Sequence, residues 1–108
     1  MHALRYKIQP GFALCLAIVG LSATAQTATE LNARSLAATC ASCHGTDGRS
    51  AEGAAVPSLA GMPKDYMLAQ MKAFKDGTRP ATIMHQLSKG FTDQQVETIA
   101  TYFFALKR

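Results

Sequence analysis

Cys40-Ala41-Ser42-Cys43-His44 carries the strongest structural signal in this 108-residue sequence. Two thiols three positions apart, followed directly by a histidine, form the C-x-x-C-H pattern that is typical of covalent attachment of a c-type haem. At this spacing the sulfurs of Cys40 and Cys43 reach the two vinyl groups along one edge of the haem. The imidazole of His44 then lies under the iron as an axial ligand. The sequence therefore predicts one haem c, with its iron, per chain.

Two other kinds of site use cysteines at this spacing. A thioredoxin-like redox pair follows a strand in a βαβ unit, and the residues around Cys40 show no such pattern. A zinc site needs four ligands, which Cys40, Cys43, His44 and His85 supply in number. Because Cys43 and His44 are adjacent in sequence, they fit tetrahedral coordination poorly. We therefore expect haem rather than zinc or a redox disulfide.

The N-terminus has the three-part layout of a secretory signal peptide. Arg5 and Lys7 precede the uncharged run GFALCLAIVGLSA at 11–23, and Ala23-Thr24-Ala25 is a small-x-small cleavage signal. A membrane-spanning helix needs ~20 apolar residues, more than this run supplies, so an uncleaved N-terminal anchor is the weaker alternative. The sequence predicts a cleaved signal peptide over residues 1–25 and a periplasmic location, because haem attachment of this type requires export.

The mature chain is then a single monohaem domain over residues 26–108. It loses two of the 11 basic residues and none of the 7 acidic ones, so the formal net charge falls from +4 to +2. This small charge gives no sign of a nucleic-acid-binding face. Cys15 leaves with the signal peptide, and the two remaining cysteines cannot close a long loop as a disulfide. So small a chain has a thin core, and we expect the haem to fill its middle.

Three segments carry helical signals. Residues 29–43 are rich in good helix formers, with Thr29 as the expected cap. Residues 63–77 begin at Pro63, end at Gly77 and carry an apolar stripe at helical spacing. The third helix starts with the capping box Thr92-Asp93-Gln94-Gln95. No segment alternates as a strand, so the sequence predicts an all-α fold of three main helices around the haem, joined by two long loops.

Four stretches, taken in order, resemble the class I cytochromes c over essentially the whole mature chain. They are LAATCASCHGTDG, VPSLAGMP, the M-x-x-x-x-x-G-x-T-D segment that begins at Met84, and IATYFFALK. The resemblance implies the class I cytochrome c fold and one-electron transfer without catalysis on a substrate. PSLAGMPKDYMLAQMKAFKDGTRPATIM and SKGFTDQQVETIATYF look especially like one branch, the cytochrome subunit of flavocytochrome c sulfide dehydrogenase. That branch implies a flavoprotein partner that oxidises sulfide.

The sixth iron ligand is expected from the loop over residues 77–91. Met84 lies far beyond His44 in sequence, past the second predicted helix, so this loop can fold over the opposite face of the haem. Met/His ligation is a known cytochrome c arrangement, and the resemblance places the methionine ligand at Met84. His85 is the alternative ligand, because bis-histidine ligation is also possible chemistry. Packing positions are expected for the other methionines outside the signal peptide, which are Met62, Met67 and Met71.

The stretch Pro57-Ser58-Leu59-Ala60-Gly61 matches the P-x-L-x-G loop of class I cytochromes. A ligating histidine normally donates its other ring N–H to an acceptor outside the coordination sphere. The resemblance implies that the carbonyl of Pro57 accepts this bond from His44 and that Leu59 presses on the haem. An ordinary turn proline is the alternative for Pro57.

Five basic residues gather between positions 64 and 89, against two acidic ones. They are Lys64, Lys72, Lys75, Arg79 and Lys89. Such a run is usually a solvated face. The more specific hypothesis is that Arg79 meets a haem propionate, while some of the lysines steer an acidic partner.

Three other functions remain open on the sequence. A free-standing periplasmic shuttle to a terminal oxidase is compatible with the same fold. A haem enzyme of peroxidase or gas-binding type needs an open sixth position on the iron. A sensory haem module is usually joined to an output domain, and so short a mature chain leaves no room for one. We expect an electron-transfer protein rather than an enzyme.

Overall fold

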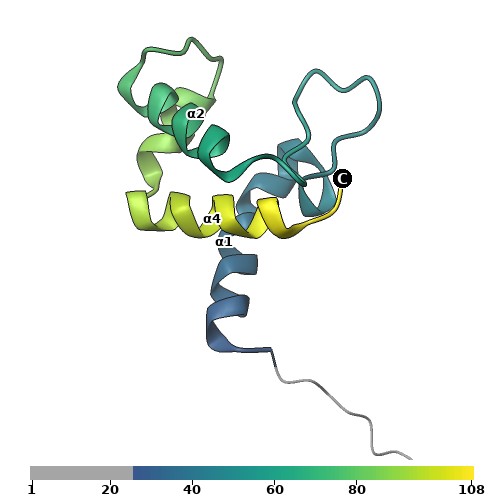
Figure 1. Ribbon diagram of the computed structural model, residues 1–108. Helices are drawn as coiled ribbons and strands as arrows, with labels where there is room; N and C mark the ends of the chain where they lie inside the picture. The colour runs from purple at the N-terminus through teal and green to yellow at the C-terminus, as the bar shows by residue number, and fades with distance from the viewer. Residues whose placement is uncertain (1–25) are drawn as a thin grey trace, which may run out of the picture.

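Three helices make up most of the computed structural model, which describes residues 26–108 (Figure 1). They are α1 over Ala28–His44, α2 over Lys64–Asp76 and α4 over Asp93–Ala105. Shorter helical turns lie in the two loops: η1 over Thr46–Gly48, α3 over Met84–Leu87 and η2 over Ser88–Gly90. Residues 26–108 contain no strand, which confirms the all-α prediction. The predicted signal peptide over residues 1–25 lies outside the described residues.

Capping boxes define where α1 and α4 begin. The α4 box is the predicted one: the Thr92 hydroxyl accepts from Gln95 N at 3.2 Å, and Gln95 Oε1 accepts from Thr92 N at 2.9 Å. The prediction of Thr29 as the cap of α1 was wrong. The cap is Thr27, because Glu30 stands three positions after it and its carboxylate accepts from Thr27 N at 2.8 Å.

The end of α2 is set by backbone conformation. Gly77 adopts a left-handed φ of 77°, which costs glycine nothing and terminates the helix as the sequence predicts. Pro63 occupies the position just before α2, where its missing N–H costs no helical hydrogen bond. The second helix therefore lies between the two predicted boundary residues and is one residue shorter at each end than the predicted range 63–77, with Pro63 as its N-cap rather than in its first turn.

A small core lies where α1, α2 and α4 meet. Its buried members are Ala37, Met67, Ile99, Ala100 and Phe103. In Figure 1, α1 and α4 cross, and α2 lies along the other side of α4. The predicted apolar stripe of α4 is buried at each of its positions, which are Val96, Ile99, Ala100 and Phe103. Phe103 is the one large apolar side chain among residues 26–108 that is fully buried, so the core of the described chain is as thin as expected.

The helices of residues 26–108 are all too short or too polar to cross a membrane.

Candidate haem site

The two thiols lie on the last turns of α1. Cys40 is half-buried against the core, and Cys43 is exposed. Burial raises the pKa of the Cys40 thiol, and a contact with the Thr39 hydroxyl opposes this in part. The C-x-x-C-H stretch thus lies on a helix end, with one sulfur facing the core and the other facing solvent.

His44 is buried, with 8% of its surface exposed, and its ring is held by the loop that follows. Its Nδ1 lies 2.7 Å from the carbonyl oxygen of Pro57. A carbonyl can only accept, so Nδ1 carries the proton, and in the neutral ring Nε2 is the nitrogen that has the free lone pair. This is the tautomer that a metal-ligating histidine needs, and the contact is the one that the resemblance implied.

The loop that carries Pro57 is attached to η1 and to α4. The carbonyl of Gly48 accepts from Ser58 Oγ at 2.8 Å, from Leu59 N at 2.7 Å and from Ala60 N at 3.1 Å. Gly61 N donates to the carbonyl of Phe103 at 2.8 Å. Sequence reasoning assigned no role to Ser58, because an acceptor on the backbone leaves no residue pattern.

Gly48 can come this close only because it has no side chain. Its φ is +71°, and a Cβ on it would lie 2.6 Å from Cε1 of Phe103 and 2.9 Å from Cβ of Leu59. Leu59, the residue assigned to press on the haem, is partly buried and packs against the core. The glycine therefore allows the His44 loop to close against α4.

Met84 begins the four-residue helix α3 and is partly buried. Met67 is buried in the core, and Met62 and Met71 pack against it, which confirms the packing positions predicted for all three. Nδ1 of His85 is buried and has no hydrogen-bond partner. The structure thus places His85, the alternative ligand, directly after Met84 on α3.

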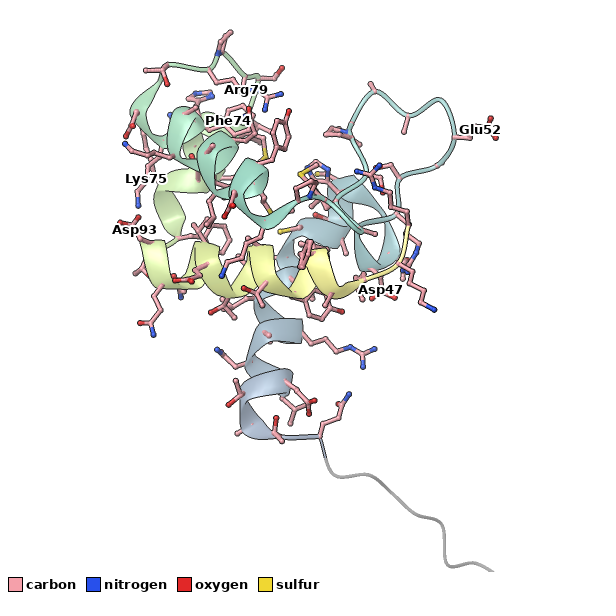
Figure 2. All side chains as sticks on the ribbon, viewed as in Figure 1. Asp47, Glu52, Phe74, Lys75, Arg79 and Asp93 are labelled. Carbon is pink, nitrogen blue, oxygen red and sulfur yellow. The ribbon has the colours of Figure 1, made fainter. Side chains whose placement is uncertain are left out.

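Arg79 is anchored on α2 rather than extended into solvent (Figure 2). Its guanidinium lies 4.6 Å from the ring centroid of Phe74, and it also donates to the Gln70 side chain. Its backbone N–H donates to Ala73 O at 3.1 Å. The guanidinium has five N–H donors, so further donors remain for another acceptor.

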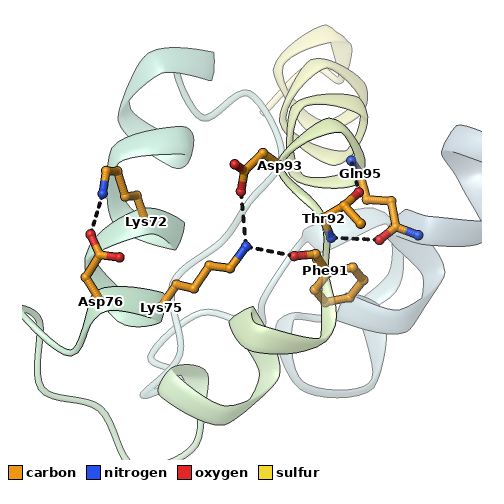
Figure 3. A network of polar contacts seen from close by, with 7 residues as sticks. All are labelled: Lys72, Lys75, Asp76, Phe91, Thr92, Asp93 and Gln95. Atoms are coloured by element: carbon orange, nitrogen blue, oxygen red, sulfur yellow. Dashed lines mark hydrogen bonds and ion pairs between the residues drawn. The ribbon is translucent and has the colours of Figure 1, made fainter.

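The lysines of α2 form ion pairs with neighbouring acids. Lys64 pairs with Glu97 at 2.9 Å, and Lys72 pairs with Asp76 on its own helix. Figure 3 shows Lys75 between α2 and α4, where its Nζ donates to Asp93 at 3.0 Å and to the carbonyl of Phe91 at 3.1 Å. These pairs favour the solvated-face interpretation of the basic run over a steering surface.

Two exposed apolar side chains and the arrangement of the possible metal ligands bear on whether the site suits a haem or a zinc ion. Val56 and Ile83 are large apolar side chains, with 36% and 55% of their surface exposed, directly before Pro57 and Met84. Apolar surface is therefore exposed on both loops that carry the expected iron environment, although Leu31, Tyr66 and Phe104 are also exposed elsewhere. No three His, Cys, Asp or Glu side chains within residues 26–108 gather as a metal site, so the zinc alternative is not assembled.

Comparison with known proteins identifies the fold family. Residues 31–107 match the family model described as Cytochrome c. The cytochrome subunit of sulfide dehydrogenase from Chlorobaculum tepidum is 38% identical over 80 residues, which cover 74% of this chain and 71% of that protein. The thiosulfate dehydrogenase electron acceptor of Thiomonas intermedia is 36% identical over 94 residues, which cover 87% of this chain and 43% of that protein.

Among solved structures, the cytochrome c4 of Acidithiobacillus ferrooxidans matches with a TM-score of 0.62 and 32% sequence identity. The match covers 69% of this chain and 49% of that one, so the chain spans about half the length of the Thiomonas and Acidithiobacillus proteins. Together with the thiols of Cys40 and Cys43, these matches show that the chain belongs to the cytochrome c family and is an electron carrier that binds haem c.

Proposed function

We propose that Cys40 and Cys43 hold the haem, that His44 and Met84 are the axial ligands of its iron, and that the protein accepts electrons from a sulfide-oxidising flavoprotein. The observation that supports His44 as a ligand is the 2.7 Å contact between its Nδ1 and Pro57 O, whereas Met84 is proposed from the family resemblance. The contact fixes the orientation of the ring and, in the neutral imidazole, leaves Nε2 as the nitrogen that can ligate iron.

Haem c supplies the Fe(III)/Fe(II) couple, and the chain sets how easily that couple changes state. Pro57 O fixes the orientation of the imidazole and raises its basicity. As a ligand, the thioether of Met84 would favour the reduced ion and raise the potential. If His44 and Met84 both bind the iron, they would leave no position open for a substrate, which would suit electron transfer, whereas a peroxidase needs one position open. Leu59 would cover the haem edge with apolar surface.

Arg79 is the proposed partner of a haem propionate. Its guanidinium is oriented by the Phe74 ring and the Gln70 side chain, so little conformational entropy is lost when a carboxylate binds its remaining donors. The charge pairing would also keep a propionate ionised beside the haem.

The test of the ligand set is the near-infrared sulfur-to-iron charge-transfer band of the ferric protein. We expect Met84→Ala to abolish this band and lower the potential, because the thioether is lost. Met71→Leu is the matched control, because Met71 packs against the core, and it should keep the band. A wild-type protein that lacks this band, and whose haem spectrum changes in His85→Ala but not in Met84→Ala, would reassign the ligand to His85.

The proposed electron donor rests on similarity to the Chlorobaculum protein, whose name places it in a sulfide dehydrogenase. In such a pair sulfide would give two electrons to the flavin of the partner. The haem of this chain would accept them one at a time and pass each to a further acceptor before taking the next. Size-exclusion chromatography of native extract tests this proposal. Haem absorbance should elute with flavin fluorescence, above the size of the mature chain alone, and sulfide should reduce that fraction. Elution as a flavin-free monomer that sulfide and the flavoprotein do not reduce would favour the free-standing shuttle.

We also propose that the protein works in the periplasm as residues 26–108, after cleavage of residues 1–25. N-terminal sequencing of periplasmic material should begin near Gln26. Retention of Arg5 and Lys7 in that material would contradict cleavage.

A further inference from the structure

One backbone carbonyl holds the loop that orients His44. The oxygen of Gly48 accepts three hydrogen bonds, from Ser58 Oγ at 2.8 Å, Leu59 N at 2.7 Å and Ala60 N at 3.1 Å. The two amide donors are present whatever the side chains are. The hydroxyl of Ser58 is the one donor of the three that the choice of residue controls.

The Ser58 hydroxyl acts on the peptide unit that bonds His44. The carbonyl of Pro57 and the N–H of Ser58 belong to one planar peptide unit, so fixing Ser58 fixes the direction in which the carbonyl points. On the other side of that carbonyl, the proline ring fixes φ. Ser58 Oγ thus braces the Pro57 oxygen that lies 2.7 Å from His44 Nδ1.

We propose that Ser58 is a positioning residue for the axial ligand, which sets the haem potential through Pro57 and His44. The inference rests on the proposed role of His44 as a ligand. A firm hydrogen bond from Nδ1 raises the basicity of the imidazole. A more basic ligand stabilises the ferric ion more than the ferrous ion, because the ferric ion carries more charge. A mobile Pro57 carbonyl weakens the bond on average and raises the potential.

Ser58 is suited to a mutational test because the residue is exposed. Loss of its hydroxyl still leaves Gly48 O with two backbone N–H donors. Ser58→Ala should fold, and its potential should rise by a roughly twofold shift of the redox equilibrium, about 18 mV at 59 mV per tenfold. The Nδ1 proton of His44, followed by NMR, should exchange with solvent roughly twofold faster or more. Ser58→Thr keeps the hydroxyl and should restore both values.

Thr92→Ala is the matched control. It removes the cap at the start of α4, at the opposite end of that helix from Phe103, and destabilises the fold without touching the Pro57 loop. The haem potential and the exchange rate of the His44 Nδ1 proton should therefore stay at those of the wild type. An unchanged potential and exchange rate in Ser58→Ala would overturn the positioning role. A wild-type protein that lacks a haem-shifted His44 Nδ1 signal would instead overturn the ligand assignment, so the two failures are distinct.

Discussion

Replacing Gly48 with alanine incurs two costs at one residue, backbone strain and a steric clash. An alanine at φ +71° adopts the left-handed region, which costs about 1 to 2 kcal/mol. Its Cβ would also lie 2.6 Å from the ring of Phe103, which is fully buried and cannot turn away. Overpacking of this kind costs about 1 to 3 kcal/mol. We expect Gly48→Ala to lose about 2 to 5 kcal/mol of unfolding free energy as the sum of both effects.

Gly53→Ala isolates the first cost. Gly53 has a φ of +76°, and a Cβ there would meet nothing within 4 Å, so it should lose only about 1 to 2 kcal/mol. Denaturant unfolding of the two haem-containing variants, followed by circular dichroism, measures the difference in unfolding free energy. The comparison requires that the dependence of this free energy on denaturant concentration is the same in both variants. Equal unfolding free energies in the two variants, to within about 0.5 kcal/mol, would show that the Phe103 ring adjusts freely and that the packing argument is wrong.

Three further outcomes are expected. Thr92→Ala should lose about 1 kcal/mol in the same unfolding assay, because the α4 box loses its hydroxyl, and an unchanged midpoint would contradict the cap. The pKa of Glu30 is held below its ordinary value of 4.5, chiefly by the hydrogen bond from Thr27 N and to a smaller extent by the one from the Thr27 hydroxyl. The stabilisation of the fold by the ionised Glu30 is therefore present above pH 4.5 and is lost as the pH falls through the folded pKa. The stability gap between wild type and Glu30→Gln should therefore shrink on acidification below pH 4.5, and a gap independent of pH would refute the assignment. The double variant Cys40→Ala, Cys43→Ala should lose helical circular dichroism, because the protein core is thin, whereas full helicity without haem would contradict that view.

The helices were predictable because their signals are local. The α4 cap lies in a four-residue motif, and Gly77 marks the end of α2 by its conformational freedom alone. The start of α1 was missed because Thr27 and Thr29 both look like caps. The spacing from Thr27 to Glu30 distinguishes them, since the two partners of a capping box stand three positions apart. The helix α3 has four residues, too few for any periodic signal.

The predictability of the site also depends on whether its residues are close together or far apart in sequence. Cys40, Cys43 and His44 are close together in sequence, so their shared chemistry is visible without a structure. The contact of His44 with Pro57 spans 13 residues and was expected only through family resemblance. The three bonds on Gly48 O could not be predicted, because a backbone acceptor is the same in every residue and only the fold decides which donors reach it.

The last residues of the chain hold the first loop, and this imposes an order on assembly. Arg49 donates to the carbonyl of Lys107 at 2.9 Å, and the C-terminus in Figure 1 lies beside the loop that follows α1. A polypeptide emerges N-terminus first, so both thiols exist before α4 is complete. Every molecule therefore passes through an open stage in which the attachment segment has no C-terminal helix to close over it. At that stage the attachment segment has been made but the helix that packs against α1 has not, so the contacts between α1 and α4 are the last of the core to form.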